Sequence, residues 1–489
     1  MAQDLEEKLE RFNKVDSHMY KFMNKFAMAQ VDMLSETPRF GPWYKYCIFI
    51  TGSQIEGGFY AKMFLDGKHI NEGDYMFSVG DIEDPKHQLQ PYEHAPGYFS
   101  VKYNGILECF HDGVREKFLE SSLAEQESNN NFLTGSSVMD MTENMFTSTA
   151  RKTRANELIG DILFQPQQPC KAEASYFQRK GPSVKIDVIL MSAGVHLVET
   201  QVDTVACFKL SSWPDDFGFE EFLNRKRKWP SNSEDVKSIQ DKVHIVPKSS
   251  PNLKEENESK YCWRLSFSKA ETHLMSLFSD EEKRVYLLFK ILFYTHIKKI
   301  KQNEKTMASY FCKTTMLWIM EEQGLELCKN IGDSLYLLEA IQMLFGKFKQ
   351  FLDNGFIPNF FYPSNNLIEG YPQDLITECS IMAGNINQRP LEYVPDIFNE
   401  CCEHLEELVE RIDQLQIEDF LDTLLEYVKE NRHLIGSTLI ELFWHLIKPR
   451  NWPGRLFFHP LVRALIRAWA RRRLIAVRNV FSRCVNCCS

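Results

Sequence analysis

A short glycine–serine turn and a pair of carboxylates are the residues whose spacing most clearly suggests chemistry. Gly52 and Ser53 follow an apolar run at 46–50, and Glu72 and Asp74 come just before a second apolar run. Because alternate side chains of a strand point to the same side, Glu72 and Asp74 would project together. Carboxylate oxygens suit Mg²⁺, which keeps positions open for water and substrate phosphate. A third carboxylate from a neighbouring strand would complete a two-metal site for attack on a phosphoryl group.

Ordinary structural roles also explain these residues when each is taken alone. An acidic pair in a polar loop is usually solvated, and a Gly-Ser pair usually only bends the chain. The third carboxylate is open between Asp187 and Asp203, each of which lies in an apolar run. A charge buried there needs a partner or a metal, so one of the aspartates would either pair with Lys185 or face solvent. Spacing alone does not choose between the two aspartates.

Composition sets the broad class of the protein. A length of 489 residues allows two to four lobes of roughly 100–200 residues each. The formal charge of −10 means that any nucleic-acid surface must be a local patch. We find no signal-peptide pattern and no run of about 18 apolar residues. The 13 cysteines are scattered and are expected to be reduced thiols, so we expect a cytoplasmic protein.

Hydrophobic periodicity predicts an α+β chain with a mixed sheet followed by helices. A long first helix is predicted over about 3–34, and the Ser/Asn/Thr-rich segment 120–154 is predicted to be a mobile loop or an insertion around a helix. The turn at 192–194 should join two antiparallel strands. Predicted strands cover 46–50, 74–79, 98–103, 184–191 and 201–210, and predicted helices cover 217–228, 271–301, 307–323, 334–353 and 396–431.

The last segment differs from the rest because residues 442–489 contain no Asp or Glu. Arginines alternate there with apolar residues, which predicts a basic amphipathic helix. Three roles are open for it. Residues 455–489 would bind an anionic membrane surface, with the terminal cysteines as acylation sites, or they would bind nucleic acid. The third role is packing on the acidic helices upstream.

Alternation in the segment 263–268 places Arg264, Ser266 and Ser268 on one face. Such a face can hold phosphate or the edge of a base, with arginine as a planar donor. A structural alternative is an exposed strand or the start of a helix, with Ser268 and Glu271 forming a capping box.

A series of short motifs resembles the cyclic GMP–AMP synthase-like receptors, which belong to the wider Mab-21 domain nucleotidyltransferases. The likeness runs over about residues 40 to 370. It rests on Thr51-Gly52-Ser53, Glu72-x-Asp74, Gln201-x-Asp203, Ser212-Trp213-Pro214, Val246-Pro247-Lys248, the segment 263–268, Ser309-Tyr310-x-x-Lys313-Thr314 and Phe356-x-Pro358.

The resemblance implies a bilobal nucleotidyltransferase fold. Its parts would be an N-terminal spine helix (1–40), a nucleotidyltransferase core (41–215) with a mixed sheet, and a helical Mab-21 lobe (216–390). A helical extension with the basic tail (391–489) has no counterpart that we can align.

Function and site also follow from the resemblance. Family members bind two Mg²⁺ (Mn²⁺ being an alternative) and join ATP and GTP into a cyclic dinucleotide. The resemblance selects Asp203 as the third metal ligand beside Glu72 and Asp74, and Gly52 and Ser53 as the phosphate-holding turn. Periodicity alone would make Tyr310 a core aromatic and Lys290 a solvated lysine. The remaining nucleotide contacts implied are Lys248, Arg264, Ser266, Ser268 and Glu271, with Tyr310 stacking on a base and Lys290 and Ser309 holding phosphate.

One departure from the family bears on the activating ligand. The vertebrate DNA sensor carries a zinc-binding His/Cys insertion after the segment that corresponds to 263–267, whereas residues 278–311 contain no cysteine. We therefore expect no structural zinc, and double-stranded RNA as the nucleic acid rather than DNA. Double-stranded RNA is recognised by its backbone and shape, which needs a basic face. The candidates are Lys14, Lys21 and Lys25, and the run Arg225, Lys226, Arg227 and Lys228, although charge runs are usually just solvated.

Two functional hypotheses remain at this stage. The first is a cytoplasmic pattern-recognition enzyme for innate immunity that binds nucleic acid, with a homodimer on the ligand as a further expectation. The second is a non-catalytic scaffold or developmental protein of the same fold. The intact Glu72, Asp74 and Asp203 favour the first hypothesis.

Overall fold

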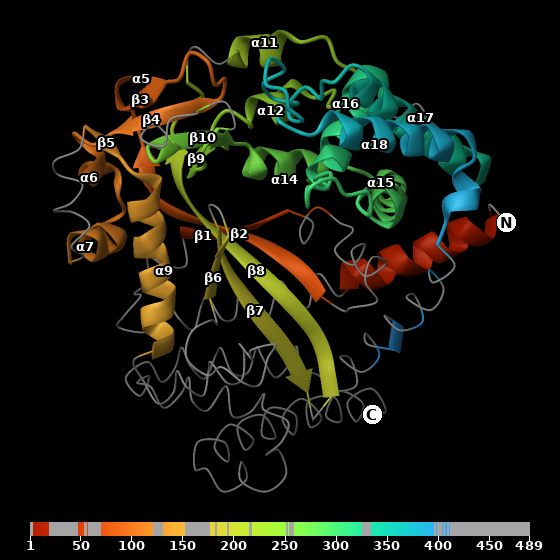
Figure 1. The fold of residues 1–489 in the computed structure, drawn as a ribbon, viewed down its shortest axis with the longest axis horizontal. Helices are drawn as coiled ribbons and strands as arrows, with labels where there is room; N and C mark the ends of the chain where they lie inside the picture. The colour runs from red at the N-terminus through yellow and green to blue at the C-terminus, as the bar shows by residue number, and fades with distance from the viewer. Residues whose placement is uncertain are drawn as a thin grey trace, which may run out of the picture.

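The computed structural model describes a sheet-based lobe and a helical lobe that lie side by side (Figure 1). The described residues are 3–18, 47–52, 56, 70–120, 131–151, 177–180, 183–192, 195–214, 218–250, 253, 259–324 and 334–395, with the single residues 398, 403, 406, 407 and 410.

Ten strands in the described residues form one mixed sheet. Only one of its strand pairs, β2 with β8, is parallel; the other pairs within these residues are antiparallel. The strand order is β1 (Ile48–Thr51), β2 (Ile70–Ile82), β8 (Val195–Leu210), β9 (His244–Pro247), β10 (Cys262–Ser266), β4 (Tyr98–Lys102) and β3 (Leu89–Pro91). β5 (Phe132–Leu133) pairs with β4, and β6 (Phe177–Lys180) pairs with β7 (Ser183–Ser192), which pairs with β8.

The five predicted strands all lie in this sheet. The predicted hairpin is also present, because β7 and β8 are antiparallel and Ser192 pairs with Val195. Strand β8 is central, and its second half buries Ala206, Cys207 and Phe208 in succession. A near-continuous apolar run is typical of a strand that is covered on both faces. The position of β8 in the sheet is therefore fixed by packing on both of its faces.

The long helices from α14 to α18 gather on one side of the sheet, and α6, α7 and α9 lie on the other side (Figure 1). Four short helices, α5 (Pro85–Gln88), α6 (Ile106–Cys109), α11 (Phe219–Asn224) and α12 (Ser233–Lys237), connect the strands, and α7 (Asp112–Glu120) and α9 (Gly135–Arg151) pack on the sheet lobe. The helical lobe contains α14 (Ser268–Ser276), α15 (Asp280–Leu292), η3 (Phe293–Ile297), α16 (Tyr310–Gln323), α17 (Ser334–Asp353), α18 (Gln373–Gln388) and η5 (Pro390–Tyr393).

The predicted single helix over 271–301 is wrong, because the chain breaks between α14 and α15. Ser279 caps α15, and Glu282 completes the capping box by accepting from the backbone of Ser279. The helices predicted over 307–323 and 334–353 are confirmed, the first starting three residues late at Tyr310. In the segment 120–154, residues 135–151 form the helix α9.

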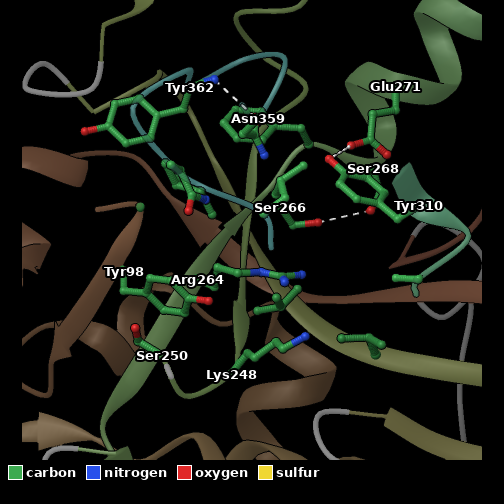
Figure 2. Close-up of a pocket in the computed structure, with 18 of the residues that line it drawn as sticks. Tyr98, Lys248, Ser250, Arg264, Ser266, Ser268, Glu271, Tyr310, Asn359 and Tyr362 are labelled. Carbon is green, nitrogen blue, oxygen red and sulfur yellow. Dashed lines mark hydrogen bonds between the residues drawn. The ribbon is translucent and has the colours of Figure 1, made fainter. Parts of the chain in front are cut away.

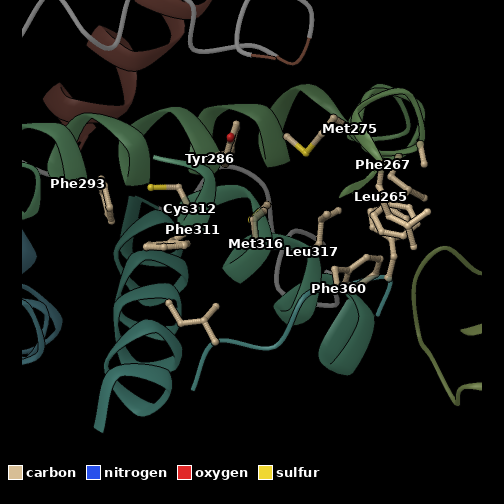
Figure 3. Packing of buried hydrophobic residues seen from close by; sticks show 14 of the residues in the cluster. Leu265, Phe267, Met275, Tyr286, Phe293, Phe311, Cys312, Met316, Leu317 and Phe360 are labelled. Atoms are coloured by element: carbon tan, nitrogen blue, oxygen red, sulfur yellow. The ribbon is translucent and has the colours of Figure 1, made fainter. Parts of the chain in front are cut away.

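An aromatic cluster joins the two lobes. The ring of Trp213, at the end of the sheet, lies 4.9 Å from the ring of Phe267, and Phe267 stacks on Phe361 at 4.7 Å. Phe267 is the residue between β10 and α14. Figure 3 shows Phe267 and Leu265 beside side chains of the helical lobe. The junction between the lobes is therefore part of a continuous core, which fixes the strand β10 relative to the helices.

The first described helix covers residues 3–18 and buries Leu5, Leu9, Phe12 and Val15. It lies along the helical lobe, where the ring of Phe12 stacks on that of Phe398 at 5.7 Å. The rest of the predicted first helix and the basic tail 455–489 lie outside the described residues, as does nearly all of 396–431. Within the described residues, no helix has the length and hydropathy that crossing a bilayer requires.

Candidate active site

A cavity of about 950 Å³ opens between the sheet and the helical lobe. Its walls come from the strands β1, β2, β8, β9 and β10, from α14 and α16, and from the loops at 95–98 and 359–371. Figure 2 shows Arg264 and Ser266 from β10 with Lys248, which follows β9, on one side, and the helix residues Glu271 and Tyr310 on the other. Segments far apart in the sequence thus meet around one space large enough for nucleotides.

The parallel register of β2 and β8 places Asp74 directly opposite Asp203. Register partners on adjacent strands point to the same face of a sheet, and both aspartates line the cavity. Asp187 lies on β7, at the other edge of β8, where it faces Gln201. Of the two candidates for the third carboxylate, the fold therefore brings Asp203 and not Asp187 beside Asp74. The backbone of Glu72 precedes Asp74 by two residues in β2, and the Glu72 side chain lies outside the described residues.

The turn after β1 packs directly against the Asp74 carboxylate. Gly52 has a φ of +73°, and a Cβ built on it would lie 2.1 Å from Asp74 Oδ2. Both the backbone conformation and the space therefore require glycine. Thr51 donates a hydrogen bond from Oγ1 to the backbone oxygen of Asp74 at 3.3 Å. Ser53 itself lies outside the described residues.

The donor set of this corner suits a hard divalent cation. Asp74 and Asp203 provide carboxylate oxygens on neighbouring strands, and Gly52 leaves no side chain of its own against Asp74. Among the described side chains, no group of three or more His, Cys, Asp or Glu residues is placed to hold a metal. Asp74 and Asp203 thus provide two carboxylate ligands, and Glu72 as the third ligand stays a prediction. The absence of a structural zinc site also stays a prediction.

Basic side chains line the cavity near the strand ends. The Arg264 guanidinium and, to a smaller extent, desolvation lower the pKa of Lys248 to about 8. Arg264 Nε is buried and has no hydrogen-bond partner within the described part of the chain. The two cations repel each other and border the same cavity, which favours an anionic occupant such as phosphate.

The side of the cavity formed by the helical lobe presents hydroxyls and a carboxylate. Ser266 and Ser268 share a hydrogen bond of 3.1 Å between their Oγ atoms. Tyr310 donates from its hydroxyl to Glu271 Oε1 at 2.7 Å. The capping alternative for Ser268 and Glu271 is wrong, because Phe267 occupies the N-cap position of α14 and Glu271 faces Tyr310.

Lys290 and Ser309 are not among the residues that line the cavity. Lys290 is 1% exposed in α15, where its ammonium lies over the ring of Tyr286 and burial lowers its pKa. The prediction that Lys290 contacts phosphate is therefore wrong for this structure. Ser309 precedes α16, and its backbone oxygen accepts from Cys312. The lysine that α16 does present to the cavity is Lys313.

The basic run after the sheet is not the open patch that its sequence predicts. Arg225 Nε lies 2.6 Å from Glu321 Oε1, the two side chains are 15% and 3% exposed, and the guanidinium stacks on three aromatic rings. Arg227 is 8% exposed and donates to a backbone carbonyl. The prediction of nucleic-acid contact is therefore wrong for Arg225 and Arg227, whereas Lys226 and Lys228 are exposed. Lys14 is also exposed, and Lys21 and Lys25 lie outside the described residues.

Sequence reasoning missed several residues of the site. Lys313 lies inside a motif that carries the family resemblance, but its sequence context alone gives it no role. Glu56 is buried beside Lys313 and follows the glycine turn, and nothing in its sequence context marked it. Tyr362 and Asn365, from the loop at 359–371, line the cavity and can be assigned only from the fold.

The fold and site define a nucleotidyltransferase class of protein, with carboxylates on adjacent strands beside a glycine turn. The Mab-21 protein nucleotidyltransferase domain matches residues 74–277, and the Mab-21 protein HhH/H2TH-like domain matches residues 281–383. The chain belongs to the Mab-21 family. It is also similar to a cyclic GMP-AMP synthase-like receptor from Aethina tumida, with 24% identity over 335 residues that make up 68% of this chain and 72% of that protein.

Proposed function

We propose that this protein is a nucleotidyltransferase that joins ATP and GTP into a cyclic dinucleotide after binding nucleic acid, in innate immune signalling. The observation that carries the proposal is the register of β2 and β8, which sets Asp74 opposite Asp203 beside the Gly52 turn. The similarity to a cyclic GMP-AMP synthase-like receptor supports the nature of the product.

In this proposal Asp74 and Asp203, with Glu72, hold Mg²⁺ or Mn²⁺. When bound, such ions neutralise charge on the attacking and leaving oxygens of a phosphoryl transfer. Lys248 and Arg264 offset the remaining phosphate charge from the strand side of the cavity.

Tyr310 stacks on a base in this proposal, with its ring orientation held by the hydrogen bond to Glu271. A ribose hydroxyl of one nucleotide attacks the α-phosphorus of the other, and pyrophosphate leaves. The same reaction on the linear intermediate closes the ring.

We further propose double-stranded RNA as the activating ligand and a cytoplasmic location. The exposed Lys14, Lys226 and Lys228 are the described side chains that we assign to its phosphates. Membrane binding through 455–489, which lies outside the described residues, and a homodimer on the ligand are parts of the same proposal.

Product analysis tests the proposal. Purified protein is incubated with labelled ATP and GTP and Mg²⁺ or Mn²⁺, with double-stranded RNA, double-stranded DNA or neither, beside an Asp74→Asn variant. We expect a cyclic product with wild-type protein and RNA, and none with the variant. If wild-type and variant proteins give no product under every ligand, the proposal fails in favour of a non-catalytic scaffold.

A further inference from the structure

One lysine of the helical lobe binds two buried carboxylates at once. Lys313 Nζ on α16 lies 2.9 Å from Glu56 Oε1 and 2.5 Å from Glu271 Oε2. The three side chains are 9%, 2% and 4% exposed, in the order Lys313, Glu56 and Glu271. The two glutamates come from opposite lobes, because Glu56 follows β1 and Glu271 lies in α14.

The Glu56 arm of this arrangement leads to the glycine turn. The backbone N–H of Glu56 donates to the carbonyl of Gly52 at 3.0 Å, so these two residues are joined directly. Gly52 in turn packs against the Asp74 carboxylate. Holding Glu56 in place therefore restrains Gly52, which packs against Asp74.

The Glu271 arm leads to the opposite side of the cavity. Glu271 Oε1 accepts from the Tyr310 hydroxyl at 2.7 Å while Oε2 binds Lys313. The Lys313 ammonium also lies 5.4 Å from the centre of the Tyr310 ring. One ammonium thus connects the turn beside Asp74 to the aromatic ring across the cavity.

Burial and charge favour stable ion pairs between Lys313 and the two glutamates. A buried carboxylate without a partner is strongly unfavourable, so neither glutamate can leave Lys313 without loss. Burial lowers the pKa of Lys313, and the carboxylates of Glu271 and Glu56 more than offset this and raise it well above its usual range. Lys313 is therefore a cation at neutral pH and binds both carboxylates.

We propose that Lys313 is a positioning residue that couples the Gly52 turn to the Glu271–Tyr310 side of the cavity, so that the triphosphate and the base of one nucleotide are held in register. This inference rests on the proposed function, because it assigns the Gly52 turn to triphosphate binding.

Glu56 offers the cleanest test, because its substitution leaves Lys313 paired with Glu271. Glu56→Leu should raise the KM for ATP about tenfold, the loss expected for one charge-assisted hydrogen bond, with kcat changed less than about threefold. Glu56→Gln keeps a neutral acceptor and should fall between wild type and Glu56→Leu. If Glu56→Leu does not fold, a rise of about threefold in the KM of Glu56→Gln for ATP would support the positioning role of Lys313.

The matched control is the exposed pair of Lys347 and Glu322, 2.7 Å apart on α17 and α16 and outside the cavity lining. Glu322→Leu and Glu322→Gln should leave KM unchanged. The Kd for a non-hydrolysable ATP analogue is measured for every variant as a second readout. Glu56 variants that match the Glu322 variants in KM and Kd would overturn the inference while leaving the proposed function intact. A wild-type protein that neither binds the analogue nor forms product would overturn both.

Discussion

Replacing Gly52 with alanine tests the contact between the glycine turn and Asp74. The new Cβ would lie 2.1 Å from Asp74 Oδ2 and 2.9 Å from its carboxyl carbon. Since contacts under 3.0 Å are essentially never seen, the carboxylate must withdraw by about 1 Å, and misplacement on that scale can reduce a reaction rate about 100-fold. We therefore expect Gly52→Ala to lower the rate of nucleotidyl transfer about 100-fold.

Gly355 provides a control with the same backbone conformation and no neighbour. Its φ is +62°, against +73° for Gly52, and a Cβ on Gly355 would meet nothing within 4 Å. Alanine in the left-handed region costs about 1–2 kcal/mol at either position, so both variants should lose similar thermal stability. Only Gly52→Ala should lose activity.

The assay is initial-rate formation of dinucleotide product, with thermal unfolding measured on the same protein samples. If Gly52→Ala keeps a rate within about threefold of that of Gly355→Ala, the turn does not constrain Asp74 and the reasoning is wrong.

Three further predictions concern individual charges. Asp203→Asn should abolish product formation while the protein stays folded, whereas Asp187→Asn, one strand further from Asp74, should keep most of its activity. Equal losses of steady-state rate in the two variants would contradict Asp203 as the metal ligand. Because the pKa of Lys248 is about 8, its positive charge is lost as pH rises from 7 to 9, and the KM for ATP should rise over that range. Lys248→Gln should flatten this dependence of KM on pH. If the wild-type and variant KM values change with pH in parallel, Lys248 does not bind phosphate. Arg225→Ala removes the 2.6 Å ion pair of the buried Glu321 and leaves it only Arg227, 3.9 Å away, so it should lower the unfolding free energy by about 3 kcal/mol. Lys226→Ala should change it by less than about 0.5 kcal/mol, and similar denaturation midpoints for the two variants would show that the Arg225 pair is not structural.

Local rules predicted much of the fold, and the misses follow from contacts distant in sequence. Strand alternation placed Glu72 with Asp74, but the choice of Asp203 over Asp187 needs the order of β2, β8 and β7, which no local pattern contains. The family resemblance supplied that choice. Ser279 and Glu282 form a capping-box pattern that indicates the start of α15. The amphipathic periodicity continues across this start, so periodicity alone predicts one long helix.

Local sequence also fails to show which charged side chains are buried, as Arg225, Arg227 and Lys290 illustrate. Arg225 and Arg227 read as a surface patch because their shared partner, Glu321, lies far along the chain, 96 residues after Arg225. Lys290 sits in an amphipathic helix with no local sign that its side chain is buried. Which charges are paired inside a fold depends on tertiary packing, so it cannot be taken from spacing alone.

Binding of Mn²⁺ in the presence of a non-hydrolysable ATP analogue tests the central claim most directly, because it needs no knowledge of the activating ligand. Titration followed by electron paramagnetic resonance would compare wild type with Asp203→Asn and Asp187→Asn. The pairing of Asp74 with Asp203 predicts that wild type and Asp187→Asn bind Mn²⁺ alike and that Asp203→Asn loses it. Undiminished Mn²⁺ binding in Asp203→Asn would contradict the account.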